Sequence, residues 1–163
     1  MVDPTAFIAP TATLIGDVHV AAGASAAFHA GLGAGYAPRL ILEGGKVQDG
    51  TGLDAPPGIP VDLGPGGTLR HCCCCHGAHI GRHALLRHHT PPLAGAIIGA
   101  RTLVAAHALV VGGTKIPDEV LVTGVPAKVR GPIAGTGAQV WIDTNAQAYQ
   151  DRARRYREGL KAV

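Results

Sequence analysis

The stretch of this chain with the most potential chemistry runs from Arg70 to Leu85 and has the sequence RHCCCCHGAHIGRHAL. His71 and His76 have four residues between them, and all four are cysteines. Imidazole nitrogen and thiolate sulfur are donors that zinc prefers in proteins, and a site with three protein ligands keeps one position open for water. The stretch is therefore a candidate metal site, and its use depends on the elements that position it.

From Ile80, inside this stretch, an apolar residue returns at every sixth position. Seven of the eight positions are aliphatic, and a small or β-branched residue follows most of them by four places. An α-helix repeats every 3.6 residues and a simple strand every two, so neither produces this pattern. The period predicts a hexapeptide-repeat parallel β-helix, in which short strands form the flat sides of stacked coils. The positions are Ile80, Leu86, Pro92, Ile98, Val104, Val110, Ile116 and Val122.

The same frame begins near the N-terminus, at Leu14 and Val20, and is interrupted twice. The interruptions cover residues 31–38 and 55–60, which are rich in glycine and proline and are predicted to leave the coil as loops. When the six-residue frame is continued through the cysteines, Cys73 and Cys75 fall at positions inside the coil. Cys72 and Cys74 then point outward.

A different pattern follows Arg130. Thr136 and Gln139 have the spacing of a capping box, and the residues after them repeat at helical spacing. We expect a helix over about 138–158, with Trp141 and Tyr149 on the side that packs against the coil. The chain is thus divided into a β-helix over residues 1–130 and a linker with a C-terminal α-helix over residues 131–163.

Composition limits the possible partners and locations. The net charge is only +3 at pH 7, and the basic excess lies mainly near the C-terminus, so we expect no nucleic-acid partner. No segment approaches the roughly 20 apolar residues of a membrane span, and no signal peptide is visible. A disulfide bond between two of four adjacent cysteines could not close a long loop. We therefore expect a reduced, cytoplasmic protein.

Several motifs resemble those of the gamma-class carbonic anhydrases and their relatives. They are the opening DPTAFIAPTATLIGDV, VQDG at 47–50, H-x4-H-G at 71–77, the exit GVPAKVR, and NAQAY in the C-terminal helix. The resemblance implies a left-handed coil, a homotrimer, and zinc or iron held by three ligands between subunits. His71 and His76 match two of the family's three histidines, and the third position is Asp54. Either Asp54 supplies the third metal ligand, or the thiolate of Cys74 takes the place of the missing histidine.

The resemblance also implies an activity. Metal-bound hydroxide would hydrate carbon dioxide to bicarbonate, at a low rate because the carboxylate of Asp54 makes the metal a poorer Lewis acid. Gln48 and Tyr149 match positions that line the site, and we predict catalytic roles for both. Two alternatives stay open. One is an acyltransferase or thioesterase acting on coenzyme A thioesters, because hexapeptide-repeat enzymes of this kind also have the GVPAKV exit. The other is a trimeric scaffold without catalytic activity.

Overall fold

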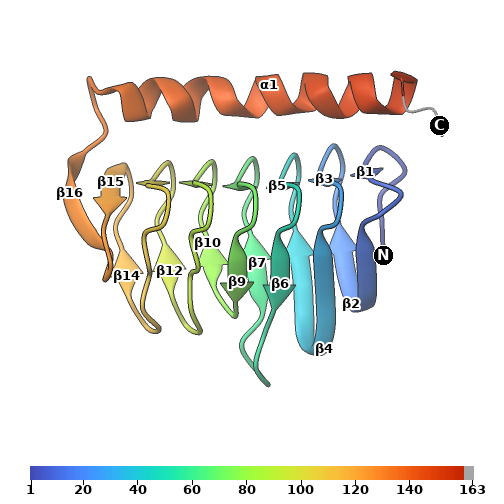
Figure 1. Cartoon of the computed structure of the whole chain (residues 1–163), viewed down its shortest axis with the longest axis horizontal. Coiled ribbons are helices and arrows are strands. Elements are labelled where there is room, and N and C mark those ends of the chain that lie inside the picture. Colours follow the sequence, from blue (N-terminus) through green and yellow to red (C-terminus); the bar gives the residue numbers. More distant parts are fainter. Residues whose placement is uncertain (160–163) are drawn as a thin grey trace.

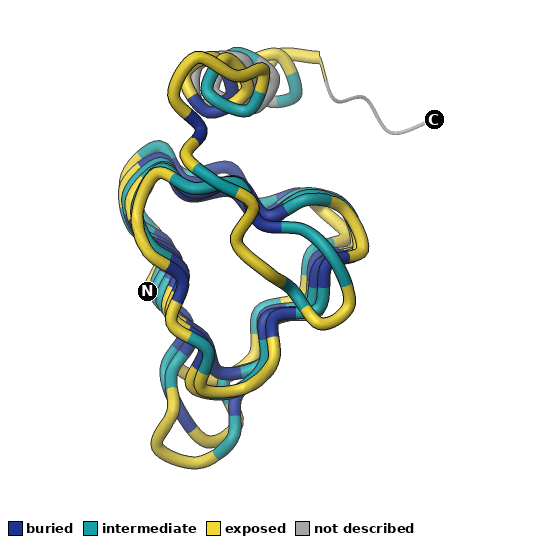
Figure 2. Tube along the Cα trace, turned by 90° about the vertical axis from the view of Figure 1, so that its left-hand side faces the viewer, coloured by how far each residue is buried: buried dark blue, intermediate teal, exposed yellow. Residues whose placement is uncertain are grey.

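The chain folds as the expected left-handed parallel β-helix with a C-terminal α-helix (Figure 1). The computed structural model describes residues 1–159, apart from the side chains of residues 146–150, 152–153 and 157. Seen along its axis, the coil is roughly triangular, and the helix lies outside one of its sides (Figure 2). No helix among the described residues is long and apolar enough to cross a membrane.

One sheet forms the side of the coil that faces the helix. Its strands are parallel, except that β16 pairs antiparallel with β15 at the C-terminal end. The strands, in spatial order, are β1 (Phe7–Ile8), β3 (Ser25–Ala26), β5 (Lys46–Val47), β8 (Thr68–Leu69), β11 (Leu85–Leu86), β13 (Leu103–Val104), β15 (Val120–Thr123) and β16 (Lys128–Pro132).

A second sheet wraps around the other two sides of the coil. This is possible because β4 pairs with β6 near its start and with β7 near its end, while β2 accompanies β4 along both sides. Its strands are β2 (Thr13–Val20), β4 (Gly31–Ile41), β6 (Gly52–Asp54), β7 (Val61–Leu63), β9 (Cys74–His76), β10 (His79–Ile80), β12 (Ile97–Ile98) and β14 (Lys115–Ile116).

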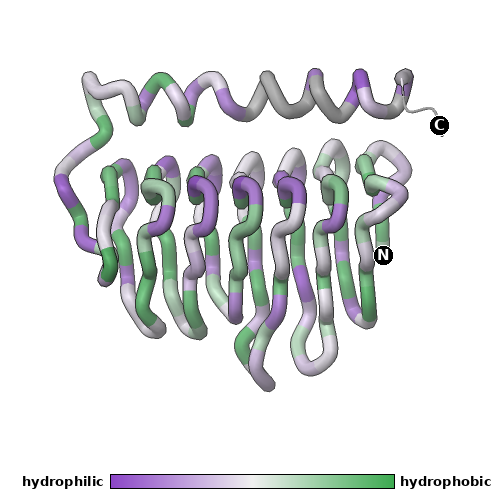
Figure 3. The backbone as a smooth tube through the Cα atoms, viewed as in Figure 1, coloured by the Kyte–Doolittle hydropathy of each residue, from purple (hydrophilic) through white to green (hydrophobic). Residues whose placement is uncertain are grey.

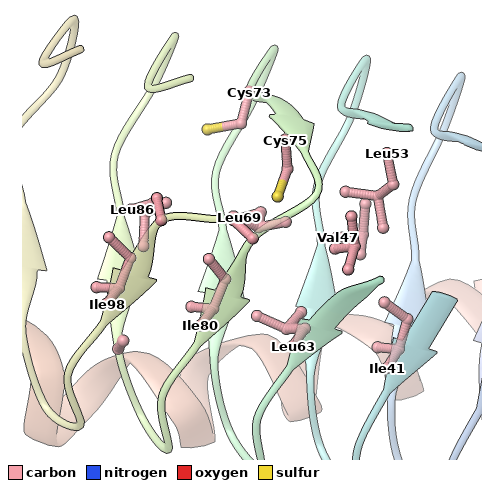
Figure 4. Packing of buried hydrophobic residues seen from close by; sticks show 14 of the residues in the cluster. Ile41, Val47, Leu53, Leu63, Leu69, Cys73, Cys75, Ile80, Leu86 and Ile98 are labelled. Carbon is pink, nitrogen blue, oxygen red and sulfur yellow. The ribbon is translucent and has the colours of Figure 1, made fainter. Parts of the chain in front are cut away.

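The hexapeptide period corresponds to the core, as predicted. Residues one coil apart stack in register, as Leu63, Ile80 and Ile98 do, and all three are fully buried (Figure 4). Burying one large aliphatic side chain is worth about 1.5–3 kcal/mol. The stacked rows therefore hold the coil together, and the corners between them are free to carry polar side chains.

One of the two predicted loops is a strand instead. Residues 31–38 belong to β4, which pairs with β2 on both sides of a register shift at Gly16 and Val18. The extra residues of β4 bulge at that shift while its two ends keep the ladder, so the loss of period in the sequence does not end the strand. The second interruption, residues 55–60, is the expected loop between β6 and β7.

The helix α1 (Gly137–Gly159) lies lengthwise over the first sheet. Both predicted capping residues bind the start of the helix: the amide of Ala138 donates to Thr136 Oγ1 at 3.2 Å, and Gln139 Oε1 accepts from the amide of Gly135 at 2.9 Å, one residue before the position that a capping box uses. Ile142 is buried against the coil, and Asn145 Nδ2 donates to Thr68 Oγ1 at 2.8 Å. The helix therefore covers the outward side chains of the first sheet.

Candidate functional site

The corner that follows the first sheet gathers chemically active side chains from three consecutive coils. Asp49, His71 and His88 each come two residues after a strand of that sheet, namely β5, β8 and β11. Backbone bonds hold these turns in register: the amide of Cys72 donates to Asp49 O, and that of His89 donates to His71 O. Figure 3 shows hydrophilic residues on successive turns below α1. The repeat thus builds a column of polar groups on a rigid scaffold.

Asp49 and His71 form a carboxylate–imidazole pair. Asp49 Oδ2 lies 3.0 Å from His71 Nδ1, and both side chains are partly exposed. The other carboxylate oxygen, Oδ1, accepts a hydrogen bond from the backbone amide of Phe28 at 3.1 Å, which fixes the carboxylate. Because a carboxylate accepts at Nδ1, the neutral ring carries its proton there, and Nε2 is the nitrogen that can take a proton from a substrate.

Further aromatic rings extend this column. His88 stacks on His71 with ring centroids 5.2 Å apart and an interplanar angle of 19°. His89 and His107, at the next position of the same corner, stack at 4.9 Å and 9°. Burial lowers the pKa of His88, and the nearby Arg70 adds to this effect. The ring of His88 is thereby favoured in its uncharged form.

A second carboxylate–imidazole pair lies on β6 and β9. Asp54 Oδ2 is 3.5 Å from His76 Nδ1, and Asp54 Oδ1 accepts the backbone amide of Ala55 at 2.7 Å. Arg39 Nη2 lies 3.5 Å from the same Oδ1 atom. Arg39 is fully buried, and desolvation lowers its pKa, with Asp54 opposing the shift. Asp54 is thus held between a buried guanidinium and an imidazole.

Gln48 and Tyr149 are the two residues for which the sequence predicts catalytic roles. Gln48 is buried, and neither atom of its side-chain amide has a hydrogen-bond partner within the described part of the chain. The side chain of Tyr149 lies outside the described residues. Catalytic roles for Gln48 and Tyr149 stay predictions.

The four cysteines are free and lie as the repeat predicts. Cys73 and Cys75 are buried, whereas Cys72 and Cys74 are exposed. Burial raises the pKa of Cys73 to about 11 and raises that of Cys75 as well, so both remain thiols at neutral pH. The inward pair is core packing, since an inaccessible thiol cannot act on a substrate.

This placement is testable with a double variant, Cys72→Ser with Cys74→Ser, which retains only the buried thiols. The native variant is expected to resist alkylation, and mass spectrometry should find two adducts only after denaturation. Cys73→Ser with Cys75→Ser is the matched control, which keeps the exposed pair. Rapid native labelling of the first variant would mean that the strand is shifted by one residue, which exchanges inner and outer faces.

Comparisons with known proteins place this site in context. No family model matches the chain. The carnitine operon protein CaiE of Escherichia coli K12 is 33% identical over 151 residues, 93% of this chain and 76% of CaiE. CaiE of Salmonella agona is 36% identical over 161 residues, 98% of this chain and 80% of that protein.

Two solved structures share the whole architecture. A hexapeptide transferase family protein from Anaplasma phagocytophilum superimposes with a TM-score of 0.90 at 26% identity, over 95% of this chain and 91% of that one. A putative acetyltransferase from Bacillus cereus superimposes with a TM-score of 0.87 at 28% identity, over 96% and 91%. Fold and repeat therefore define a hexapeptide-repeat β-helix protein. Within that class, the chain belongs to the family of the carnitine operon protein CaiE.

The family assignment corrects several expectations. Carbonic anhydrase activity, a zinc or iron cofactor and carbon dioxide as substrate are wrong, because the relatives are CaiE and transferase-type proteins. Among the described residues, no three histidine, cysteine, aspartate or glutamate side chains form a group that could hold a metal. His71 and His76 are each paired with a carboxylate instead. That His71, His76 and Asp54 share a site between two copies stays a prediction, without the metal.

Sequence reasoning missed the pairing of Asp49 with His71. A signal for it was available, because one coil takes three hexapeptides, as the pairing of Ile80 with Ile98 shows. The loop at 55–60 lengthens the interval between Asp49 and His71, which hides their stacking in the sequence. The buried Arg39 beside Asp54 was also missed, since it directly follows residues 31–38, where the period is lost.

Proposed function

We propose that this protein is an acyltransferase that moves an acyl group from a coenzyme A thioester to an amine or hydroxyl group. The observation that carries the proposal is the Asp49–His71 pair, with 3.0 Å between Oδ2 and Nδ1 on a partly exposed corner. Similarity to a hexapeptide transferase family protein and to a putative acetyltransferase supports a transferase over a lyase.

The proposed step uses His71 as general base. His71 Nε2 takes a proton from the acceptor while the acceptor's nitrogen or oxygen forms a bond to the thioester carbonyl carbon. The carbon–sulfur bond then breaks, and the departing coenzyme A thiolate takes the proton from the His71 imidazolium, which regenerates the neutral base. Asp49 keeps the ring in the required tautomer and stabilises the imidazolium that forms during the step.

We further propose that the active form is a homotrimer in the cytoplasm. Gly31 and Gly52 present bare backbone on the outer side of the second sheet, where an added Cβ would meet no other atom within 4 Å. Such a flat surface suits close approach of another copy, and a closed ring would make all interfaces equivalent. In this arrangement His71 of one copy and the Asp54–His76 pair of its neighbour line a shared cleft. Sedimentation equilibrium tests the trimer.

The activity is tested by incubating the purified protein with acetyl coenzyme A and a panel of small amines, amino sugars and alcohols. Chromatography with mass spectrometry should detect an acetylated acceptor and an equal amount of free coenzyme A. Coenzyme A released with acetate and no acetylated acceptor would contradict the transferase and favour the thioesterase. If no thioester is consumed with any acceptor, the enzymatic proposal fails and a trimeric scaffold becomes the better interpretation.

A further inference from the structure

The ring of His71 is held on two sides by different contacts. Asp49 Oδ2 binds Nδ1 at one edge of the ring, and the ring of His88 stacks on one face. The ring turns about its Cβ–Cγ bond, and a single hydrogen bond at Nδ1 still tolerates some rotation. A parallel ring on the adjacent coil removes this freedom, because rotation would end the stacking contact.

The β-helix holds His88 in a fixed position beside the ring of His71. His88 follows β11, whose register with β8 is set by the pairs Leu85–Thr68 and Leu86–Leu69. Leu85 and Leu86 are fully buried, so β11 cannot shift against β8 without disturbing the core. The amide of His89 also donates to His71 O at 3.2 Å, which ties the two corners together.

The arginines beside these histidines have a separate partner. The guanidinium carbons of Arg87 and Arg70 lie 5.1 and 5.7 Å from the ring centroid of Trp141 on α1. Such cation–π contacts hold the arginine side chains toward the helix. The stacked imidazoles therefore occupy the corner itself, where a substrate would approach.

We propose that His88 is a positioning residue, whose stacked ring fixes the plane of His71 so that Nε2 points toward the acceptor. This inference rests on the proposed role of His71 as general base. His88 touches neither donor nor acceptor in this scheme and acts only through His71. A misdirected base lowers the rate of the chemical step but leaves substrate binding unchanged.

The test compares His88→Ala, which removes the ring, with His88→Phe, which keeps a ring that can stack. His88→Ala should lower kcat about tenfold and leave both KM values near those of the wild type. His88→Phe should restore most of kcat. His107→Ala is the matched control, because it breaks the other stacked pair of the same corner without removing a contact to His71.

Nitrogen-15 spectra of the imidazole rings give a readout that does not need activity. In the wild type, His71 should show the tautomer protonated at Nδ1, and His88→Ala should shift it toward a mixture, whereas His88→Phe should not. A loss of stability alone would leave this ratio unchanged. Unchanged kcat and spectrum in His88→Ala, or a His88→Phe variant as impaired as His88→Ala, would overturn the proposal. If the wild type transfers no acyl group, the proposed function fails, but the spectra still decide whether His88 orients His71.

Discussion

His71→Ala is expected to lower kcat/KM for acyl transfer by about 10²- to 10⁴-fold, the range that general-base catalysis supplies. The loss should fall on kcat, because the imidazole accepts a proton only as the acceptor attacks the thioester. Asp49→Asn should cause a smaller loss. An amide can donate to Nδ1 as well as accept from it, so the substitution weakens control of the tautomer and keeps the general base.

The matched control for this prediction is His29→Ala. His29 is a corner histidine of an earlier coil and shares the left-handed backbone conformation of His89 and His107. Its removal should leave the rate unchanged, which separates loss of a base from loss of any corner histidine. A His71→Ala enzyme with nearly wild-type kcat would assign the base elsewhere, with His76 the first candidate because its Nδ1 also lies near a carboxylate, that of Asp54.

The fold could be predicted because every coil repeats the same packing requirement. Val104, Val110 and Ile116 each fill one side of the interior, and a stack of such layers has only one simple architecture. The start of the helix followed from the capping residues Thr136 and Gln139 in the same local way. The six-residue period and the capping residues depend on neighbours along the chain. Both can therefore be recognised in the sequence alone.

The chemistry was not predictable from the same motifs. The motifs VQDG, H-x4-H-G and GVPAKVR lie at corners and at the exit of the coil, so they shape backbone turns that proteins of different activity share. Which partner His71 takes depends on a residue one coil away, and Asp49 lies beyond a loop of variable length. The resemblance therefore identified the architecture and gave the wrong reaction.

Lys46 shows another limit of sequence reasoning. Alternation on β5 places it outside the coil, where a lysine is normally solvated. Only the structure shows that α1 covers this face and leaves the side chain 1% exposed, with Nζ donating to Gly44 O at 2.7 Å. Burial lowers the pKa of Lys46 from 10.5 to about 8. The ammonium form is thus disfavoured beneath the helix.

Lys46→Met is therefore expected to stabilise the protein by about 3 kcal/mol at pH 7, because each pKa unit corresponds to about 1.36 kcal/mol. Below pH 8 the lysine is protonated in both folded and unfolded chains, and the folded state bears the full cost of the buried charge. Between pH 8 and 10.5 the unfolded chain binds more protons at this site, so the wild type gains stability as the pH rises. The advantage of the methionine variant should shrink over that interval.

Urea unfolding of both proteins at pH 7 and pH 10, at one protein concentration, measures this difference. Comparing variant with wild type at each pH cancels the other groups that titrate. Lys115→Met removes an exposed lysine from β14 and should change stability by less than about 0.5 kcal/mol. An advantage of Lys46→Met that is equally large at pH 7 and pH 10 would show that the gain comes from apolar contact alone. A less stable Lys46→Met variant would show that the ammonium group has a compensating partner beneath α1.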